Sequence, residues 1–484
     1  MRKGSITIYL SFVFSILLSL VVTLISQAGN LALKLQAECA MDSAMYSVFS
    51  EYQRELFDRY DLFFIDSSYY AKSGSIDETR NHYYHYLEEN LAREKGMFQS
   101  KSFEISGAKA EQIKVLSYAL ATDENGSVLK RQAIDYMKSK YGSDYIKLLK
   151  NQLELVNQYQ LLTRDIKAEQ RANQAAIKAV KLPKRKTKNG WEDLQLHNPA
   201  DVINDLQGVR ILDLVLGTSL FLSNSAINQN EYASKRDLKT GYRIPSRSSN
   251  TPLEELIFNE YIVEKCSNYT DERDGGKLSY ELEYVLVGKE SDRDNLEHVC
   301  ERLIFMRQAS NTVYLFSNQD KVKEAKALAA VVCVLLVSPE LIDLVTYSLL
   351  FAWEFAESIH DVKVLLNKGS VPLIKTDDSW HYSLENIFQV LSDEVTDEIV
   401  AGQDDSQKEN GEPCYKDYLR IFLALESTSK KANWMMDIIE MNIQNSTSNS
   451  AFHLDNCLDY LEVEAIIIGK YAEYCCIKRH YQYL

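Results

Sequence analysis

The longest uninterrupted apolar run lies at the start of the chain. No charged residue occurs between Gly4 and Leu33, and 14 of the 22 residues from Ser5 to Ser26 are Leu, Ile, Phe or Val. A helix of about 20 such residues crosses the hydrocarbon core of a bilayer. At roughly −0.4 kcal/mol per large apolar residue, insertion is favoured by about 6 kcal/mol. The pattern therefore predicts a transmembrane helix.

The helical pattern continues beyond this segment, because apolar residues recur at steps of three or four and the first proline is Pro183. We therefore expect one helix to run from the membrane into the first domain. A cleaved secretory signal is the alternative, since Ser26-Gln27-Ala28 has the small-x-small form that signal peptidase accepts. Against cleavage, the apolar segment exceeds the roughly 7 to 15 residues of ordinary signal peptides.

Short apolar runs and helical patterns then alternate, which predicts a small α+β unit over residues 61–142. We expect a strand at 61–66, a helix near 78–95, an extended segment at 102–120, a turn at Asn125-Gly126 and a helix around 128–140. Residues 145–180 lack Pro and Gly and predict a long helix, either a hairpin or a coiled-coil arm.

Two polar stretches are interpreted as linkers or exposed loops. Residues 181–190 hold Pro183 within a basic cluster, and residues 235–252 hold two prolines and three serines. A helix is expected between them, over 200–224. The basic cluster is Lys184, Arg185, Lys186 and Lys188, which is typical of a solvated loop and alternatively of a contact with anionic wall polymers or lipid headgroups.

The last part of the chain predicts a helix-rich α+β domain over 253–484. Tyr280, Leu282, Tyr284 and Leu286 alternate with other residues, which predicts a strand over 278–288. Helices are expected at 252–266, 291–316, 321–366 with a break at Ser338-Pro339, and 414–445, and an extended segment at 461–468. Residues 325–337 are apolar nearly all round but too short for a span, so they predict a buried core helix.

The fold class is thus α+β and helix-rich, with a transmembrane helix followed by an exported mixed region that contains long helices. The expected divisions are 1–60 for the transmembrane helix and its amphipathic continuation, 61–142 for the small α+β unit, 143–252 for a helical arm with linkers, and 253–484 for the last domain.

Charge bears on location and partners. Arg2 and Lys3 flank the apolar segment, whereas the first charges beyond it, Lys34 and Glu38, form a mixed pair, so the positive-inside bias predicts a cytoplasmic N-terminus and an exported C-terminal region. The net charge of −15 disfavours nucleic acid as a partner. Eight scattered cysteines lack paired C-x-x-C spacing, so no zinc site and no specific disulfide is predicted.

No catalytic motif emerges, and no catalytic residue, metal site or cofactor is predicted. His82 and His85 have a spacing that can hold a metal, but no third ligand is nearby, and we interpret them as a surface pair. Asp292, Asp294 and Glu297 lack the Gly and distant Glu of a calcium loop, so they predict a helix start with N-terminal acids.

Several segments resemble a known family. They are Lys3-Gly-Ser-Ile-Thr-Ile-Tyr-Leu10, the segment from Leu35-Gln-Ala-Glu-Cys-Ala40 to Tyr60-Asp-Leu-Phe-Phe-Ile-Asp66, residues 280–296, Val371-Pro-Leu-Ile-Lys375 and Phe452-His-Leu-Asp-Asn-Cys457. Together they resemble an uncharacterised family of membrane-anchored proteins of clostridia-like bacteria, a domain of unknown function. The resemblance spans nearly the whole chain and implies no known activity.

The opening also resembles the start of TadE/TadG-type pseudopilins, minor proteins of Tad-type pili. In that pattern a basic residue and Gly precede the helix, but Tyr9 stands here where the pseudopilins have Glu. The resemblance therefore implies location and partners, and it does not imply peptidase cleavage after Gly4.

Small hydroxyl residues form a stripe on the apolar helix. Thr7, Ser11, Ser15, Ser19 and Thr23 recur every four residues, so each lies about 40° round from the last. Small residues and interhelical hydrogen bonds drive helix association in lipid. The stripe predicts a packing face for a partner helix, and the alternative is that each hydroxyl bonds its own helix.

These observations predict a structural or assembly component of a Tad-like pilus or related envelope apparatus. The expected partners are the membrane and other envelope or pilus-assembly proteins. A cell-envelope hydrolase and a surface ligand-binding protein are the alternatives, and they predict a cleft with converging carboxylates or Cys and His, and a deep apolar pocket, respectively.

Overall fold

The computed structural model describes residues 3–69, 71, 74–92, 108–141, 184–187, 190–193, 211–216, 222–243, 251–273, 275–335, 341–386, 412–469 and 474–483. The chain forms two compact units. Unit 1 comprises Met1–Tyr136, Asn230–Asn250 and Met436–Leu484, and unit 2 comprises Met137–Gln229 and Thr251–Met435. The expected helix-rich α+β fold with a long apolar N-terminal helix is confirmed.

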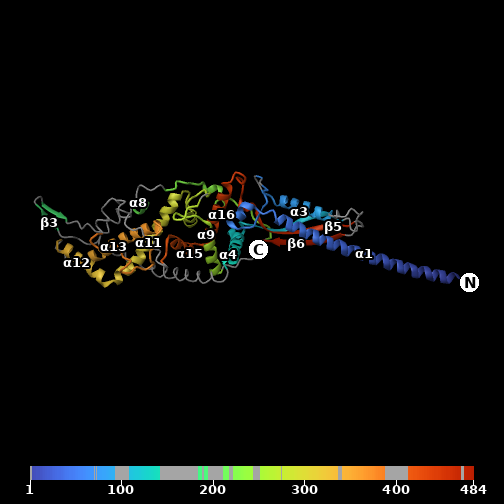
Figure 1. Cartoon of the computed structure of the whole chain (residues 1–484), viewed down its shortest axis with the longest axis horizontal. Helices are drawn as coiled ribbons and strands as arrows, with labels where there is room; N and C mark the ends of the chain where they lie inside the picture. The colour runs from blue at the N-terminus through green and yellow to red at the C-terminus, as the bar shows by residue number, and fades with distance from the viewer. Residues whose placement is uncertain are drawn as a thin grey trace. The chain divides into compact units, whose positions relative to one another are not determined.

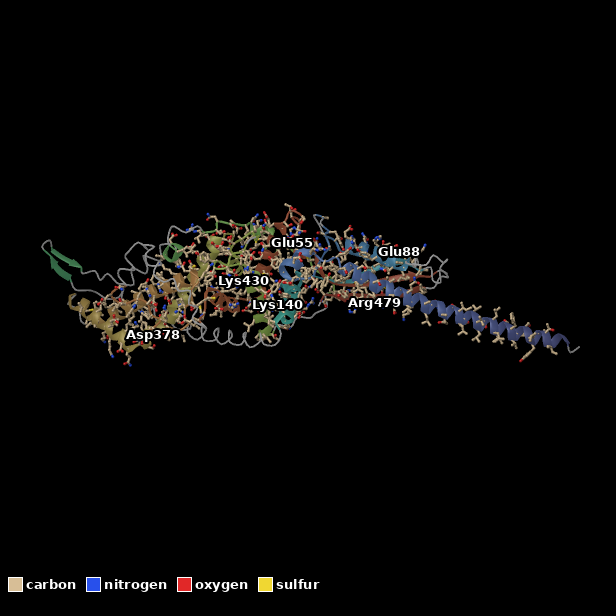
Figure 2. The ribbon with its side chains drawn as sticks, viewed as in Figure 1. Glu55, Glu88, Lys140, Asp378, Lys430 and Arg479 are labelled. Atoms are coloured by element: carbon tan, nitrogen blue, oxygen red, sulfur yellow. The ribbon has the colours of Figure 1, made fainter. Side chains whose placement is uncertain are left out.

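Helix α1 runs without a break from Lys3 to Phe49, which confirms the prediction of one long helix. Among the described residues, α1 is the one helix that is long and apolar enough to cross a membrane. Its most apolar 18-residue stretch has a mean hydropathy of 2.6, and none of that stretch is buried. Length and composition suit a membrane span or a signal sequence equally. Figure 2 shows the first part of α1 extending beyond the rest of unit 1.

The second part of α1 joins the core of unit 1. Its buried residues Leu33, Ala37, Met41, Ala44 and Val48 follow steps of three or four, so they lie on one face. This face packs against helix α3 (Ile76–Leu91) and strand β6 (Tyr474–Gln482), as Figure 1 shows. The same helix therefore supplies an exposed apolar segment and a core element.

Strand β5 (Cys457–Ile468) is central in the antiparallel sheet of unit 1. Strand β2 (Lys109–Leu120) pairs along one side of it, and β6 and the two-residue β1 (Ile65–Asp66) pair along the other. Alternate residues of β5 are fully buried and face the core, as expected for a half-covered sheet; they are Leu461, Val463, Ala465 and Ile467. The extended prediction for 461–468 is confirmed, and the strand expected at 61–66 is confined to its last two residues.

Three further helices complete the first part of the chain: α2 (Arg54–Tyr60), α3 and α4 (Asp123–Tyr141). Helix α3 begins at the N-cap Ser75, whose side chain accepts a hydrogen bond from Asp77 N. Asn125 and Gly126 have positive φ angles within the kinked start of α4, so the predicted turn is confirmed.

Unit 2 is mainly helical. Helix α9 (Pro252–Lys265) starts with a capping box of Thr251 and Glu254, and α11 (Asp292–Ser317) packs on α13 (Ile342–Leu366), which also contacts α12 (Gln319–Leu335). Other described helices of the chain are α8 (Ile211–Leu216), α15 (Tyr415–Leu425) and α16 (Thr428–Gln444). Two 3-10 helices, η1 (Gln229–Glu231) and η4 (Leu454–Asn456), are also described. The helices expected at 252–266 and 291–316 are confirmed, whereas the helix expected at 414–445 is divided into α15 and α16 by the non-helical residues Glu426 and Ser427.

The strand prediction at 278–288 is wrong, because this segment holds helix α10 (Glu281–Val287). The alternation was misleading because the intervening glutamates, Glu281 and Glu283, are also buried. Both accept backbone hydrogen bonds, from Ser267 N and Tyr269 N respectively. Because residues at both odd and even positions are buried, the alternating pattern does not indicate which face is exposed to solvent.

The basic stretch expected as a loop forms a hairpin of β3 (Lys184–Thr187) and β4 (Gly190–Asp193). Its antiparallel register pairs Lys184 with Asp193 and Arg185 with Glu192. The buried core helix expected at 325–337 is also corrected, since Val331 of α12 is 60% exposed while Ala329 is buried.

Some predictions lie outside the described residues. These are the arm at 145–180, the break at Ser338-Pro339 and most of the helix expected at 200–224. Of that helix, the structure describes α8, which is helical, and residues 222–224, which are not.

Candidate functional site

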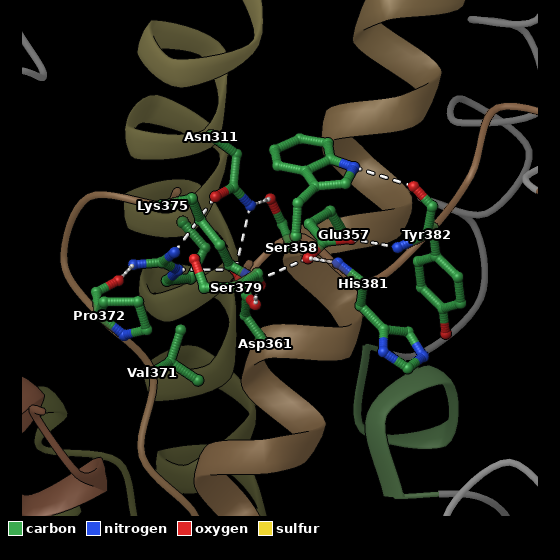
Figure 3. Close-up of polar contacts among 12 residues, drawn as sticks. Asn311, Glu357, Ser358, Asp361, Val371, Pro372, Lys375, Ser379, His381 and Tyr382 are labelled. Carbon is green, nitrogen blue, oxygen red and sulfur yellow. Dashed lines mark hydrogen bonds and ion pairs between the residues drawn. The ribbon is translucent and has the colours of Figure 1, made fainter. Parts of the chain in front are cut away.

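Unit 2 contains four charged side chains buried together between two helices (Figure 3). Arg307 comes from α11, Glu357 and Asp361 come from α13, and Lys375 comes from the segment that follows α13. The two acids are four residues apart and therefore share one face of α13. All four side chains are buried, which is rare for such residues unless they are paired.

The four charges balance through direct contacts. Arg307 Nε donates to Asp361 Oδ2 at 2.9 Å, and Lys375 Nζ lies 2.7 Å from Asp361 Oδ1 and 2.5 Å from Glu357 Oε1. Burial alone would raise the pKa of Asp361, but the charges of Arg307 and Lys375 outweigh it and hold the pKa below its usual value. The network is thus two cations and two anions, each desolvated and each paired.

Further hydrogen bonds of the network go to the side chains of Asn311 and Tyr418 and to the backbone of the segment after α13. Arg307 Nη1 donates to Pro372 O at 2.9 Å, and Glu357 accepts from His381 N at 2.9 Å and from Tyr382 N at 3.0 Å (Figure 3). These contacts hold the segment against α11 and α13. The arrangement is a structural clamp, because the charged atoms are engaged by protein groups.

Two histidines lie beside this clamp. His360 stacks on His381 with ring centroids 3.9 Å apart, and burial lowers the pKa of His360 to about 3, so its ring is neutral. Parallel stacked rings present their faces to each other and not their nitrogen lone pairs. This geometry suits packing better than joint metal ligation.

A second acidic cluster lies in unit 1. It consists of Glu440, His453 and Asp455, each of which offers one possible ligand atom. These three atoms lie within 4.8 Å of one another, a spacing that could hold a metal ion. However, Arg236 Nη2 donates to Glu440 Oε1 at 3.0 Å and to Asp455 Oδ1 at 2.7 Å. The guanidinium therefore already supplies the positive charge that a metal would bring, and we assign the cluster to an internal ion pair.

A third buried group is Glu283 of α10. Its Oε1 accepts hydrogen bonds from Tyr415 Oη at 2.7 Å and Tyr269 N at 3.0 Å, while among the described residues Oε2 has no hydrogen-bond partner. Burial raises the pKa of Glu283 to about 7. This carboxyl group can therefore change its charge near neutral pH.

An open groove of about 490 Å³ lies on unit 1 between the start of α3 and β2. Its lining includes Asp77 and Arg80, which pair with each other at 2.9 Å, and Tyr118 and Tyr242, whose backbones form two hydrogen bonds. The described lining thus has one carboxylate, and that carboxylate is neutralised by its neighbour.

The hydroxyl stripe on α1 is placed by the structure on an exposed helix surface. Ser11 Oγ donates to Ile8 O at 2.8 Å, Ser19 Oγ to Ile16 O at 2.9 Å and Thr23 Oγ1 to Ser19 O at 2.8 Å. The hydroxyl protons at these three positions are thus used within the helix. The side chains are still small enough to let a partner helix approach closely, so the packing face stays a prediction.

The other residues singled out in the sequence are not brought together. Lys184, Arg185 and Lys186 lie on β3, Lys3 begins α1, and Arg2 and Lys188 lie outside the described residues.

The histidine pair divides between two environments. His82 is half-buried, lies 3.1 Å from Glu51 and stacks on Tyr69, whereas His85 is exposed. Sequence reasoning also missed the charged clamp, although Glu357 and Asp361 follow the apolar first half of α13 and offered a signal.

The predicted helix start at Asp292 is confirmed, since Ser291 caps α11 and accepts a hydrogen bond from Asp294 N. Asp292 itself is buried and accepts hydrogen bonds from Ser279 N and Tyr280 N. These acids therefore organise the start of a helix.

Comparison with known proteins gives one match. Residues 189–468 match a family of unknown function, DUF5702. No curated protein matches the chain. No solved structure matches it either. Because the matched segment covers more than half of the chain, the protein belongs to this family of unknown function and carries a long apolar helix ahead of the matched segment.

Proposed function

We propose that this protein is a membrane-anchored, extracytoplasmic structural or assembly component of an envelope apparatus of the Tad-like kind. It acts through protein contacts and not through chemistry. The observation that supports this proposal is α1, in which one helix is both the apolar segment and part of the core of unit 1.

The continuity of α1 matters because a flexible linker would let the domain move freely above the membrane, whereas a continuous helix fixes its distance. Over 47 residues at 1.5 Å each, α1 is about 70 Å long. Fixed spacing from the membrane is useful to a component that must align with neighbours. It brings no advantage to an enzyme with a diffusing substrate.

The buried charged groups of both units also favour a contact-based role over the hydrolase alternative. The clamp around Arg307 and the cluster around Arg236 have their carboxylates paired internally. A hydrolase needs titratable groups that face an open cleft. The described groove on unit 1 offers a single carboxylate, Asp77, which is paired with Arg80.

The test is association within membranes. Replacing Ser11, Ser15 and Ser19 together by Leu enlarges the predicted packing face while keeping the segment apolar. We expect insertion to persist and crosslinking to partner helices to fall, since helix association in lipid relies on the close approach that small residues allow. Replacing Phe12, which lies off the stripe, by Leu is the matched control and should leave crosslinking unchanged.

Unchanged crosslinking of the correctly inserted triple variant would show that the stripe is no interface. The same membranes establish orientation, because a reporter fused after Leu484 should be active only outside the cytoplasm. Genes for a pilus ATPase and platform protein beside this one would favour the assembly role, and wall-metabolism genes would favour the hydrolase.

A further inference from the structure

The inference concerns the end of unit 1 that lies nearest the apolar segment. On α1 the first buried residue is Leu33, seven residues after Ser26, where the continuous apolar segment ends. At 1.5 Å per residue, this leaves about 10 Å of helix between the two. The packed part of unit 1 therefore begins close to the membrane surface that α1 would cross.

Strand β6 contacts α1 in a regular order. Tyr481 packs on Phe49 with ring centroids 4.6 Å apart, while two residues earlier Arg479 Nε donates to Asp42 Oδ1 at 2.6 Å and Nη2 lies 3.8 Å from Glu38. Earlier residues of β6 thus lie beside earlier residues of α1. The start of the strand points toward the apolar segment.

This order fixes the height of Tyr474, the first residue of β6. From Arg479 it is five residues back, about 16 Å of strand or 11 residues of helix, which brings it level with about residue 29. Counting instead from the contact of Tyr481 with Phe49 gives about residue 34. Tyr474 therefore lies about 5 to 12 Å beyond Ser26, and a headgroup layer adds about 5 to 8 Å to each side of the hydrocarbon core.

The surface at this height suits lipid headgroups. Tyr474 is 77% exposed, more than any other large apolar or aromatic side chain in the described residues, and Leu31 and Leu35 of α1 are 69% and 64% exposed. Ile468 pairs with both Tyr474 and Lys109, so the exposed Lys109 lies at the same end of the sheet as Tyr474. Aromatic rings with a polar tip are enriched at membrane interfaces, and lysine places its charge in the headgroups while its methylene chain covers apolar surface.

We propose that this end of unit 1, formed by Tyr474, Lys109, Leu31 and Leu35, is seated in the headgroup layer of the membrane that α1 spans. The inference rests on the proposed anchorage and goes beyond it, because a helix can anchor a domain without the domain touching lipid. It identifies phospholipid as the partner of this surface. Unit 1 would then have one fixed height and one fixed face toward the membrane.

The experiment uses the full chain in nanodiscs of phosphatidylcholine and phosphatidylglycerol, with and without bromine near the headgroup end of the acyl chains. Tyr474→Trp places an indole on the proposed contact. The matched control is Tyr46→Trp, because Tyr46 is 61% exposed on α1 but lies about 30 Å beyond Ser26. The wild-type emission is subtracted in both cases.

We expect the added indole of Tyr474→Trp to lose about half of its emission in brominated nanodiscs, since interfacial aromatic rings reach the upper acyl chains. Tyr46→Trp should lose none. Co-elution of the protein with the discs tests anchorage separately. If the protein co-elutes and the indole at position 474 is not quenched, the proposed contact of unit 1 with the headgroup layer is refuted while the membrane anchorage by α1 stands. If the protein does not co-elute, both the contact and the anchorage are refuted.

Discussion

The buried carboxyl group of Glu283 predicts a pH dependence of stability in unit 2. Its pKa is raised from 4.5 to about 7, chiefly by burial and further by the nearby charge of Asp292, while the hydrogen bonds from Tyr415 and Tyr269 act in the opposite direction. The folded protein thus holds this proton more tightly than the unfolded chain. Stability must fall as pH rises through the interval between the two pKa values.

The magnitude follows from the two pKa values. Below pH 4.5 the group is protonated in both states and contributes no pH dependence, and above pH 7 it is ionised in both. Between these limits the unfolded chain loses the proton first, so the free energy of unfolding declines by about 3 kcal/mol in total. From pH 5 to pH 8 the decline is about 2 to 3 kcal/mol.

Glu283→Gln isolates this effect, because it retains an oxygen to accept from Tyr415 and cannot ionise. Urea unfolding followed by tryptophan fluorescence reports on unit 2, which contains all four tryptophans. The stability of the variant relative to wild type should rise by about 2 to 3 kcal/mol between pH 5 and pH 8. Glu301→Gln, at an exposed position of α11, should give a constant difference. A constant difference for Glu283→Gln as well would refute the reasoning.

Two further substitutions test packing in unit 2. Lys375→Met should lower the free energy of unfolding by about 3 to 5 kcal/mol, because it leaves buried carboxylates uncompensated, and adding Glu357→Gln should recover part of the loss by restoring charge balance; a cost below about 1 kcal/mol would argue against the clamp. Gly288→Ala should cost about 2 to 4 kcal/mol, because Gly288 has a φ of +74° and an added Cβ would lie 2.4 Å from Trp434. In a Trp434→Leu background, the clash with the indole is removed, so Gly288→Ala should lower the free energy of unfolding only by the cost of the positive φ angle, about 1 to 2 kcal/mol. Unfolding followed by circular dichroism measures this difference.

Elements with strong local signals were predictable from the sequence. The apolar run and the absence of proline before Pro183 gave α1, and the capping residues Ser291 and Thr251 mark the starts of α11 and α9. The segment 278–288 was not predictable in the same way, since its glutamates are buried by partners distant in the sequence. Tyr415, which donates to Glu283, lies 132 residues further along the chain.

The charged clusters depend on the same long-range geometry. Arg236 meets Glu440 across 204 residues, and Arg307 meets Asp361 across 54. The local sequence around an arginine does not show which carboxylate it will contact in the fold. These ion pairs could therefore not be assigned from the sequence. Only an acid within an apolar helix, such as Asp361 in α13, gave a hint that a buried partner was required.

The division of α1 between an exposed apolar segment and the core of unit 1 has a mechanical consequence for the proposed anchor. Met41, Met45, Val48 and Phe49 are buried in unit 1, and each such side chain contributes about 1.5 to 3 kcal/mol when removed from water. Pulling α1 out of unit 1 would expose all four, so the joint between anchor and domain is part of the fold and resists separation. A displacement of the anchor along or around its own axis must therefore move β6 and α3 with it, because both pack on the same helix face. A flexible tether would absorb such a displacement, whereas this joint transmits it to the domain.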